Sequence, residues 1–141
     1  MRHLITFLLV LFMLQQPATA QTLSDADKSA FQSIITGQID AFQADDGPRA
    51  YEFAAPMIRQ IFPNPDVFMT MVRKGYPQVY RPQSYRFGEA GLSASGRPTQ
   101  RVTIVGPDGI SYEAIYTMEQ QPGGSWQING CAIVRAPELG A

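Results

Sequence analysis

The chain has 141 residues, of which 45% are hydrophobic, and a formal net charge of −1 at pH 7. This length is typical of one domain, and the near-neutral charge argues against nucleic acid as a general partner. One cysteine and one histidine exclude an internal disulfide and most familiar metal and nucleophile sites, so we expect no metal and no cofactor.

The first twenty residues have the pattern of a cleavable export signal. A positive start at Arg2 precedes an apolar run, Leu4 to Leu14, that is too short to span a bilayer. Ala18-Thr19-Ala20 then places small residues at the cleavage position. We therefore predict a signal peptide over residues 1–20, one mature domain over residues 21–141, and a periplasmic or secreted location. No second apolar run is long enough to form a membrane span.

Helical periodicity fills the first half of the mature chain. Ser24 stands before two acids and an apolar stripe, which is the pattern of a capped helix start. Prolines at first-turn positions begin the following helices, because proline loses no hydrogen bond there. We predict helices from Ser24 to Phe42, from Pro48 to Ala55, from Pro56 to Phe62 and from Asn64 to Gly75.

The second half changes to an alternating period. The two prolines between Tyr76 and Pro82 favour an extended connector. We predict strands near Ser84–Gly88, Gln100–Val105, Ile110–Glu119 and Trp126–Val134. Pro107-Asp108-Gly109 and Pro122-Gly123-Gly124 provide tight turns, so the last three strands should form an antiparallel meander. The expected fold is α+β, with N-terminal helices packed on one face of a curved antiparallel sheet of about four strands.

Strand alternation predicts which side chains face the helices. The inward rows of the last two strands are Ile110, Tyr112, Ala114, Tyr116 and Met118, and Trp126, Ile128, Gly130, Ala132 and Val134. Asp40, Glu113 and Glu119 fall on solvent-facing positions. Cys131 would point outward by strict alternation, or inward if Gly130 marks a bulge. We expect its thiol to be inert, either buried or at an interface.

Gln38 is the polar residue whose position demands a partner, because it falls near the middle of the apolar stripe of the first helix. A buried, unpaired amide costs about 1 to 3 kcal/mol, so Gln38 either ties the helix to a carbonyl or binds a ligand. Tyrosines combine apolar bodies with polar tips, as small-molecule pockets require. The candidate ligand-binding residues are Gln38, Tyr112 and Tyr116, with Tyr76 and Tyr80 at the mouth of the pocket.

Short runs along the whole mature chain carry a family resemblance. They are Gln38, Ala41-Phe42, Asp45, Ala50, Phe53-Ala54, Pro56, Ile58, Phe62, Phe68, Met71-Val72, Gly75-Tyr76 and Val79, and finally Trp126 to Cys131. This pattern resembles the bacterial domain of unknown function family DUF4864, which implies no known activity, cofactor or catalytic residue. More distantly, helices followed by a meander are similar to the NTF2-like superfamily. That cone-shaped α+β fold includes ketosteroid-isomerase-like enzymes, ligand carriers and dimeric interaction domains.

Three functions fit these observations. The first is non-enzymatic binding of a small apolar ligand or a protein partner through a cone pocket. The second is a ketosteroid-isomerase-like acid–base enzyme, which needs Asp40, Glu52 or Glu113 inside the pocket beside a tyrosine. The third is a structural or envelope-interaction protein, whose basic segment from Arg73 to Arg101 meets an anionic surface. We also expect a homodimer through the outer sheet face, formed by Thr103, Val105, Ile115, Thr117 and Ile133.

Overall fold

The computed structural model describes residues 22–136. The signal peptide predicted over residues 1–20 lies outside the described residues. Within residues 22–136, every helix is too short or too polar to cross a membrane. The elements are α1 (Asp25–Gln43), α2 (Gly47–Glu52), α3 (Pro56–Ile61), α4 (Pro65–Gly75), α5 (Pro77–Tyr80), β1 (Ser84–Leu92), β2 (Pro98–Val105), β3 (Ser111–Gln120) and β4 (Trp126–Arg135).

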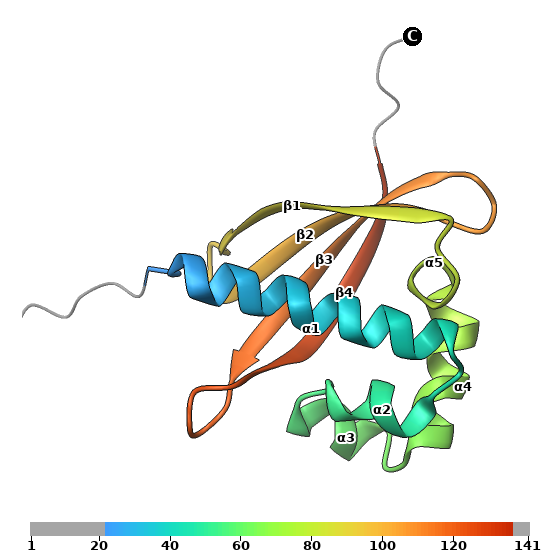
Figure 1. Ribbon diagram of the computed structural model, residues 1–141, viewed down its shortest axis with the longest axis horizontal. Coiled ribbons are helices and arrows are strands. Elements are labelled where there is room, and N and C mark those ends of the chain that lie inside the picture. The colour runs from blue at the N-terminus through green and yellow to red at the C-terminus, as the bar shows by residue number, and fades with distance from the viewer. Residues whose placement is uncertain (1–21, 137–141) are drawn as a thin grey trace, which may run out of the picture.

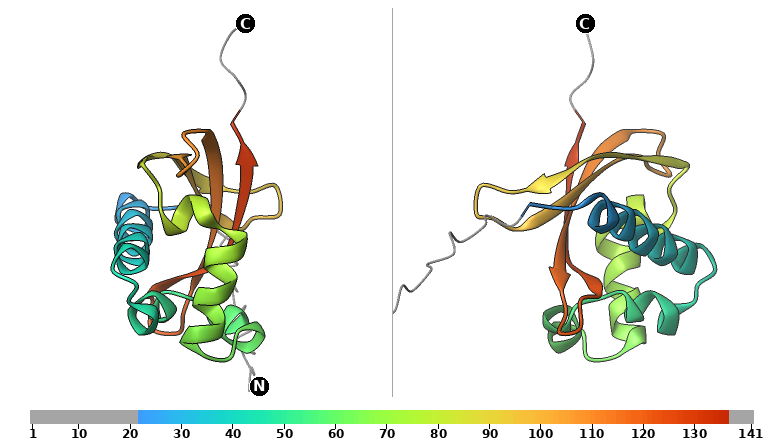
Figure 2. Two further views of the ribbon diagram at one scale, coloured as in Figure 1. Left: turned by 90° about the vertical axis from the view of Figure 1, so that its right-hand side faces the viewer. Right: turned by 60° about the vertical axis from the view of Figure 1, so that its left-hand side comes forward.

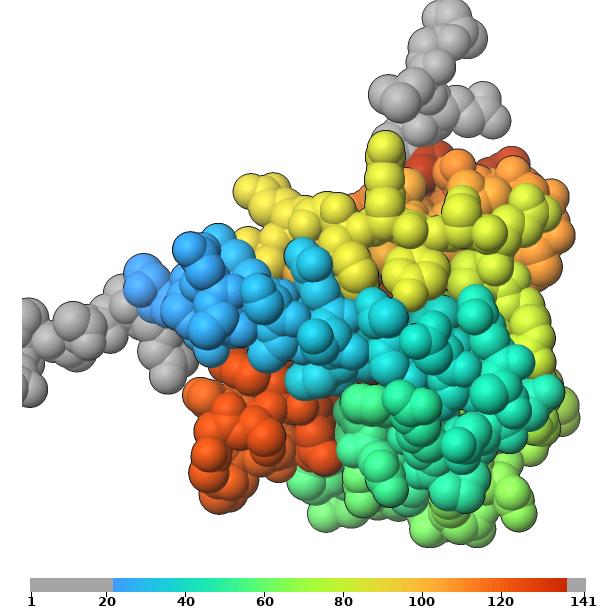
Figure 3. All heavy atoms as spheres, in the orientation of Figure 1, coloured from blue at the N-terminus to red at the C-terminus, as the bar shows by residue number. Residues whose placement is uncertain are grey.

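The four strands form one antiparallel sheet in the order β1-β2-β3-β4, and the helices gather on one side of it (Figure 1, Figure 2). α1 crosses that side of the sheet. In the space-filling view, α1 lies between β1, in yellow, and the turn that joins β3 to β4, in orange (Figure 3). These layers confirm the predicted α+β class.

The start of α1 is capped by its own residues and tied to the last strand. The Ser24 hydroxyl accepts from the Asp27 backbone N–H at 3.0 Å, and the Asp27 carboxylate accepts from the Ser24 N–H at 3.0 Å. Asp27 Oδ1 also accepts from Trp126 Nε1 at 3.3 Å. The ring of Phe31 meets the ring of Trp126 edge to face, with centroids 4.8 Å apart. α1 is therefore fixed against β4 from its first turns.

The core lies between α1 and the inner face of the sheet. Its largest fully buried side chains are Tyr116, Phe31, Phe42, Ile35, Ile39, Ile104, Gln100 and Val102. Gln100 is polar, and its side-chain amide donates hydrogen bonds to backbone carbonyls. A bulge in β1 between Phe87 and Ala90 interrupts the pairing with β2, and Gln100 Nε2 donates to the Gly88 carbonyl there at 3.0 Å. A buried amide thus supplies a hydrogen bond where the ladder is irregular.

The connector from Tyr76 to Pro82, which the prolines predicted to be extended, contains the short helix α5. Proline restricts chiefly the residue before it, and the restricted residues Tyr76 and Arg81 are non-helical here. Pro77 itself occupies a first-turn position, where proline is favoured. Because Val79 can then bury its side chain, the segment forms one helical turn instead of an extended strand.

A bulge in β4 overturns part of the predicted inward row. Thr117 pairs with Gly130, and Met118 pairs with Ile128, so Asn129 is an extra residue without a partner. Beyond it the alternation is reversed. Cys131 and Ile133 pack against the core, whereas Ala132 is exposed and Val134 is 50% exposed. The inward prediction for Ala132 and Val134 was therefore wrong, and so was the outward prediction for Ile133.

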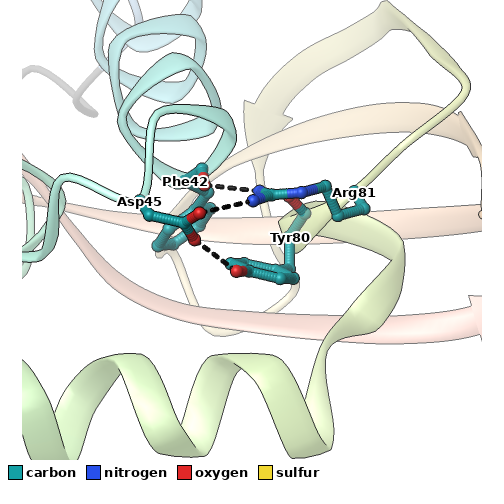
Figure 4. A network of polar contacts seen from close by, with 4 residues as sticks. All are labelled: Phe42, Asp45, Tyr80 and Arg81. Carbon is teal, nitrogen blue, oxygen red and sulfur yellow. Dashed lines mark hydrogen bonds and ion pairs between the residues drawn. The ribbon is translucent and has the colours of Figure 1, made fainter.

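The end of α1 is fastened to the end of α5 by a group that we call the Asp45 clamp: Phe42, Asp45, Tyr80 and Arg81 (Figure 4). The Asp45 carboxylate accepts from the Tyr80 hydroxyl, and from Arg81 Nη2 at 3.0 Å. Arg81 Nη1 donates to the Phe42 carbonyl, and the Arg81 guanidinium lies 4.0 Å from the centre of the Tyr80 ring. The clamp holds two segments together that are far apart in the sequence.

Asp45→Asn should lower the melting temperature at pH 7. Asparagine tolerates the positive φ of 53° at this position but loses the ionic attraction to Arg81. The hydrogen bond from Tyr80 lowers the pKa of Asp45 below its usual 3.8. The stabilisation is therefore present above that value and is lost as the pH falls through the lower pKa of the folded state.

The difference in melting temperature between the wild type and Asp45→Asn should therefore shrink at acid pH, as measured by circular dichroism between pH 7 and pH 2. Asp40→Asn, on the exposed face of α1, is the matched control and should show little difference at either end. A gap of constant size across this range would contradict the assigned role of the clamp.

Candidate functional site

A cavity of about 240 Å³ lies between the helices and the inner face of the sheet. Most of its wall is apolar and comes from the helical side. This part of the wall includes Phe42, Ile58, Phe62, Phe68, Met71 and Val72. The strands close the other side with Tyr116 of β3 and with Ile128, Asn129 and Cys131 of β4. A mostly apolar wall with a few polar groups is the usual make-up of a small-molecule site.

Gln38 reaches this cavity from α1 and is 5% exposed. Its Nε2 donates to the carbonyl of Ala50 at 3.1 Å, which ties α1 to α2. Gln38 therefore has the first of the two roles expected from the sequence, in which its amide ties the helix to a backbone carbonyl. Its ligand-binding role stays a prediction, supported by its position on the cavity wall.

Tyr116 places a buried phenol on the cavity wall. The residue is 1% exposed, and among the described residues its hydroxyl finds no hydrogen-bond partner. Burial raises the pKa of Tyr116 well above its usual value, and the neighbouring Cys131 thiol adds to the rise. The phenol is therefore neutral, and the group beside its O–H is the sulfur of Cys131, which is only a weak acceptor. An unsatisfied buried polar group of this kind costs about 1 to 3 kcal/mol.

Asn129 is a second unsatisfied group on the same wall. Its Oδ1 is buried, and no described residue donates to it. The side chain is at this position because Asn129 is the extra residue of the β4 bulge. The sequence analysis did not identify Asn129 as a site residue. The signal that could have found it was Gly130, whose place inside a strand is typical of a bulge.

Cys131 faces the cavity beside Tyr116. Burial raises the pKa of its thiol to about 12, and the Tyr116 hydroxyl opposes this rise only in part. The thiol is therefore protonated at neutral pH, which agrees with the expectation of an inert cysteine.

The five predicted ligand-binding residues do not all meet at this site. Gln38, Tyr76 and Tyr116 line the cavity. Tyr80 lies in the Asp45 clamp, where its hydroxyl is already bonded. The Tyr112 hydroxyl donates to Asp108 Oδ2 at 2.6 Å, in the turn that precedes β3. Neither Tyr80 nor Tyr112 lines the cavity, so we do not include them in the candidate site.

No carboxylate lines the cavity within residues 22–136. Asp40 and Glu52 are exposed. Glu113 lies on the outer face of the sheet, 3.7 Å from Arg101 Nη1. In the described part of the chain, no group of three or more histidine, cysteine or acidic side chains is placed to hold a metal ion. The three carboxylates that an acid–base mechanism would need are therefore away from the tyrosines of the cavity.

Cys131 in the folded protein should react very slowly with a thiol reagent such as DTNB at pH 8. A pKa of about 12 instead of 9.0 leaves about a thousandfold less thiolate, which is the reactive form. The measurement compares the reaction rate in buffer with the rate in denaturing urea. Full reaction of the native protein within seconds would show that the thiol is not buried in this cavity.

Comparison with known proteins identifies a family but no activity. No curated protein and no solved structure matches the chain significantly. Residues 24–141 match the model of a family described as a domain of unknown function, DUF4864. Since this match spans most of the chain and agrees with the resemblance of its residue pattern, the chain belongs to the DUF4864 family.

Proposed function

We propose that this domain is a non-enzymatic binding protein that holds one small, largely apolar molecule in the cavity between its helices and its sheet. The observation that carries the proposal is the cavity itself, which has a mostly apolar wall and about 240 Å³ of space. Scaling from the roughly 150 Å³ cavity that holds benzene, about 240 Å³ suits a molecule of roughly ten non-hydrogen atoms.

The cavity favours this function over the two alternatives. An acid–base enzyme needs a carboxylate beside the tyrosine, and Asp40, Glu52 and Glu113 all lie outside the cavity wall. A purely structural protein would fill its pocket with side chains, whereas this pocket retains about 240 Å³. Binding of a largely apolar molecule requires no carboxylate on the wall.

The proposal extends to the fold family, the location and the assembly. The order of helices and meander supports an NTF2-like cone, in which ligand carriers are known. The pattern of residues 1–20 supports export to the periplasm or the medium. Thr103, Val105, Ile115 and Thr117 of the outer sheet face support a homodimer, with Ala132 and Val134 in the place first expected for Ile133.

Tyr116→Phe should stabilise the ligand-free protein by about 1 kcal/mol in urea denaturation. It removes a buried hydroxyl that has no partner and keeps the ring that packs in the core. Tyr51→Phe is the matched control, because the Tyr51 hydroxyl donates to the Phe62 carbonyl at 2.8 Å and its loss should destabilise by about 1 kcal/mol. Destabilisation by both substitutions would give the Tyr116 hydroxyl a structural role instead.

Naphthalene, with ten carbon atoms, should raise the melting temperature of the wild-type protein, because a ligand that binds only the folded state stabilises it. Met71→Trp should abolish the shift, since the larger side chain occupies part of the cavity. Met57→Trp makes the same change at a methionine of α3 that is 53% exposed and outside the cavity, and it should retain the shift. Equal shifts in the two variants would place the bound probe elsewhere, and no shift in the wild type would refute the proposed function.

A further inference from the structure

We propose that the free edge of β4, from Cys131 to Arg135, binds an extended segment of a partner protein, which adds to the sheet as a further strand. This inference goes beyond the proposed function, because it concerns the edge of the sheet and not the cavity. It is carried by the backbone groups along this edge, by the protein's own use of the neighbouring stretch of the same edge, and by the charge at the end of the strand.

The backbone of this stretch has donors and acceptors that face away from β3. The Ala136 N–H donates to the Ser111 carbonyl at 3.0 Å, so residue 136 faces β3. In antiparallel pairing this direction alternates along the strand, so residues 134 and 132 also face β3. The backbone N–H and carbonyl groups that point to the open edge, with no hydrogen bond to a described residue, are therefore those of Cys131, Ile133 and Arg135.

The protein itself adds an extended segment to the neighbouring stretch of this edge. The Ile128 N–H donates to the Phe53 carbonyl, and the Ala55 N–H donates to the Ile128 carbonyl, each at 2.8 Å. Ala54, between these two residues, forms a parallel bridge with Ile128. At Pro56 the chain turns into α3. Where this edge of β4 is covered, extended backbone covers it, and beyond the bulge the same edge continues without such a partner among the described residues.

The free stretch of β4 lacks the features that usually protect an edge strand. At the other edge of the sheet, β1 is interrupted by a bulge and carries charges at Arg86 and Glu89. Residues 131–135 pair regularly with β3, and they include no proline and a single charge, at Arg135. The left view of Figure 2 shows the end of β4, in red, extending past the helices. This edge is thus open to strand addition, in which backbone hydrogen bonds provide the affinity.

The side chains beside the edge indicate what the added segment contains. Residues opposite each other in a sheet lie on the same face, so the segment would meet Ile133 on the inner face and Ala132 and Val134 on the outer face. β-branched residues pack well against such neighbours. Arg135 forms no ion pair with a described residue, so an acidic residue opposite it would add a favourable cross-strand pair.

The charge at Arg135 favours a partner protein over a second copy of β4. β4 contains no aspartate or glutamate, so a second copy paired along this edge would supply no acid to Arg135. The nearby Asp108 carboxylate accepts from Tyr112 and Ile110 instead. We therefore expect a partner segment of alternating β-branched residues with one acid at the end that meets Arg135.

Binding of the peptide acetyl-Glu-Thr-Val-Thr-Val-amide, followed by NMR at pH 7, tests the proposal. Antiparallel pairing places its glutamate opposite Arg135 and its central valine opposite Ile133. In the free protein the amides of Ile133 and Arg135 should exchange with solvent rapidly, whereas those of Ala132 and Val134, which face β3, should exchange slowly. With saturating, millimolar peptide, the exchange of the Ile133 and Arg135 amides should become about tenfold slower.

Two N-methylated peptides separate backbone pairing from other modes of binding. Methylation of the central valine removes the N–H that would donate to the Ile133 carbonyl, and it should abolish binding. Methylation of the first threonine, whose N–H faces away from the edge, should leave the affinity within about twofold.

A charge reversal tests the assigned end of the segment. Arg135→Glu should weaken binding of the peptide by about two- to fivefold, and replacement of the peptide's glutamate by lysine should restore it. Arg86→Glu makes the same change at an exposed residue of β1, on the opposite edge of the sheet, and should leave the affinity unchanged.

The proposal would be overturned if the peptide shows no saturable binding at millimolar concentration, or if the two methylated peptides bind equally well. Slow exchange of the Ile133 and Arg135 amides in the free protein would also overturn it, because the edge would then be covered already, by the chain itself or by a second copy. The stabilisation by naphthalene does not depend on this edge, so each of these results leaves the proposed function as it stands.

Discussion

One extra residue in β4 determines which side chains of that strand line the cavity. Two hydrogen-bonded strands can keep a strict alternation only if each residue has a partner, and Asn129 has none between the pairs Thr117–Gly130 and Met118–Ile128. The chain beyond the bulge is therefore turned over, and the thiol of Cys131 faces the core beside Tyr116. Without the bulge, strict alternation would turn Cys131 outward and Ala132 inward. The bulge in the sheet thus determines which groups of β4 face the cavity.

The helices around the cavity are joined by hydrogen bonds from a few polar side chains. Gln38 joins α1 to α2, and Tyr51 joins α2 to the end of α3 through the carbonyl of Phe62. The Asp45 clamp joins α1 to α5. Among the described residues, buried side-chain atoms without a hydrogen-bond partner belong to Gln78, Gln100, Tyr116 and Asn129, and of these Tyr116 and Asn129 line the cavity.

Local pattern predicted the fold class, all four strands and the inner face as far as Ile128, because periodicity and turn residues are properties of neighbouring positions. It failed at the β4 bulge, because there the pairing with β3 determines which side chains face inward. The same division applies to the site. Tyr116 and Gln38 lie on inward-facing stripes, so the pattern identified both as cavity residues. The Tyr80 hydroxyl instead donates to Asp45, 35 residues away in the sequence, and periodicity cannot reveal such a contact. Tyr112 lies in the inward row, yet its hydroxyl donates a hydrogen bond to Asp108 at the end of the strand.

The central claim is that the cavity is built for a molecule other than its own side chains. Native mass spectrometry of the protein purified from its own host tests this most directly, because gentle ionisation preserves a retained ligand. We expect an added mass of one molecule of roughly ten non-hydrogen atoms on the wild type, and its absence from the Met71→Trp variant, whose cavity is smaller. Wild-type protein that carries no such mass, at any concentration of protein and after the mildest purification, would contradict it.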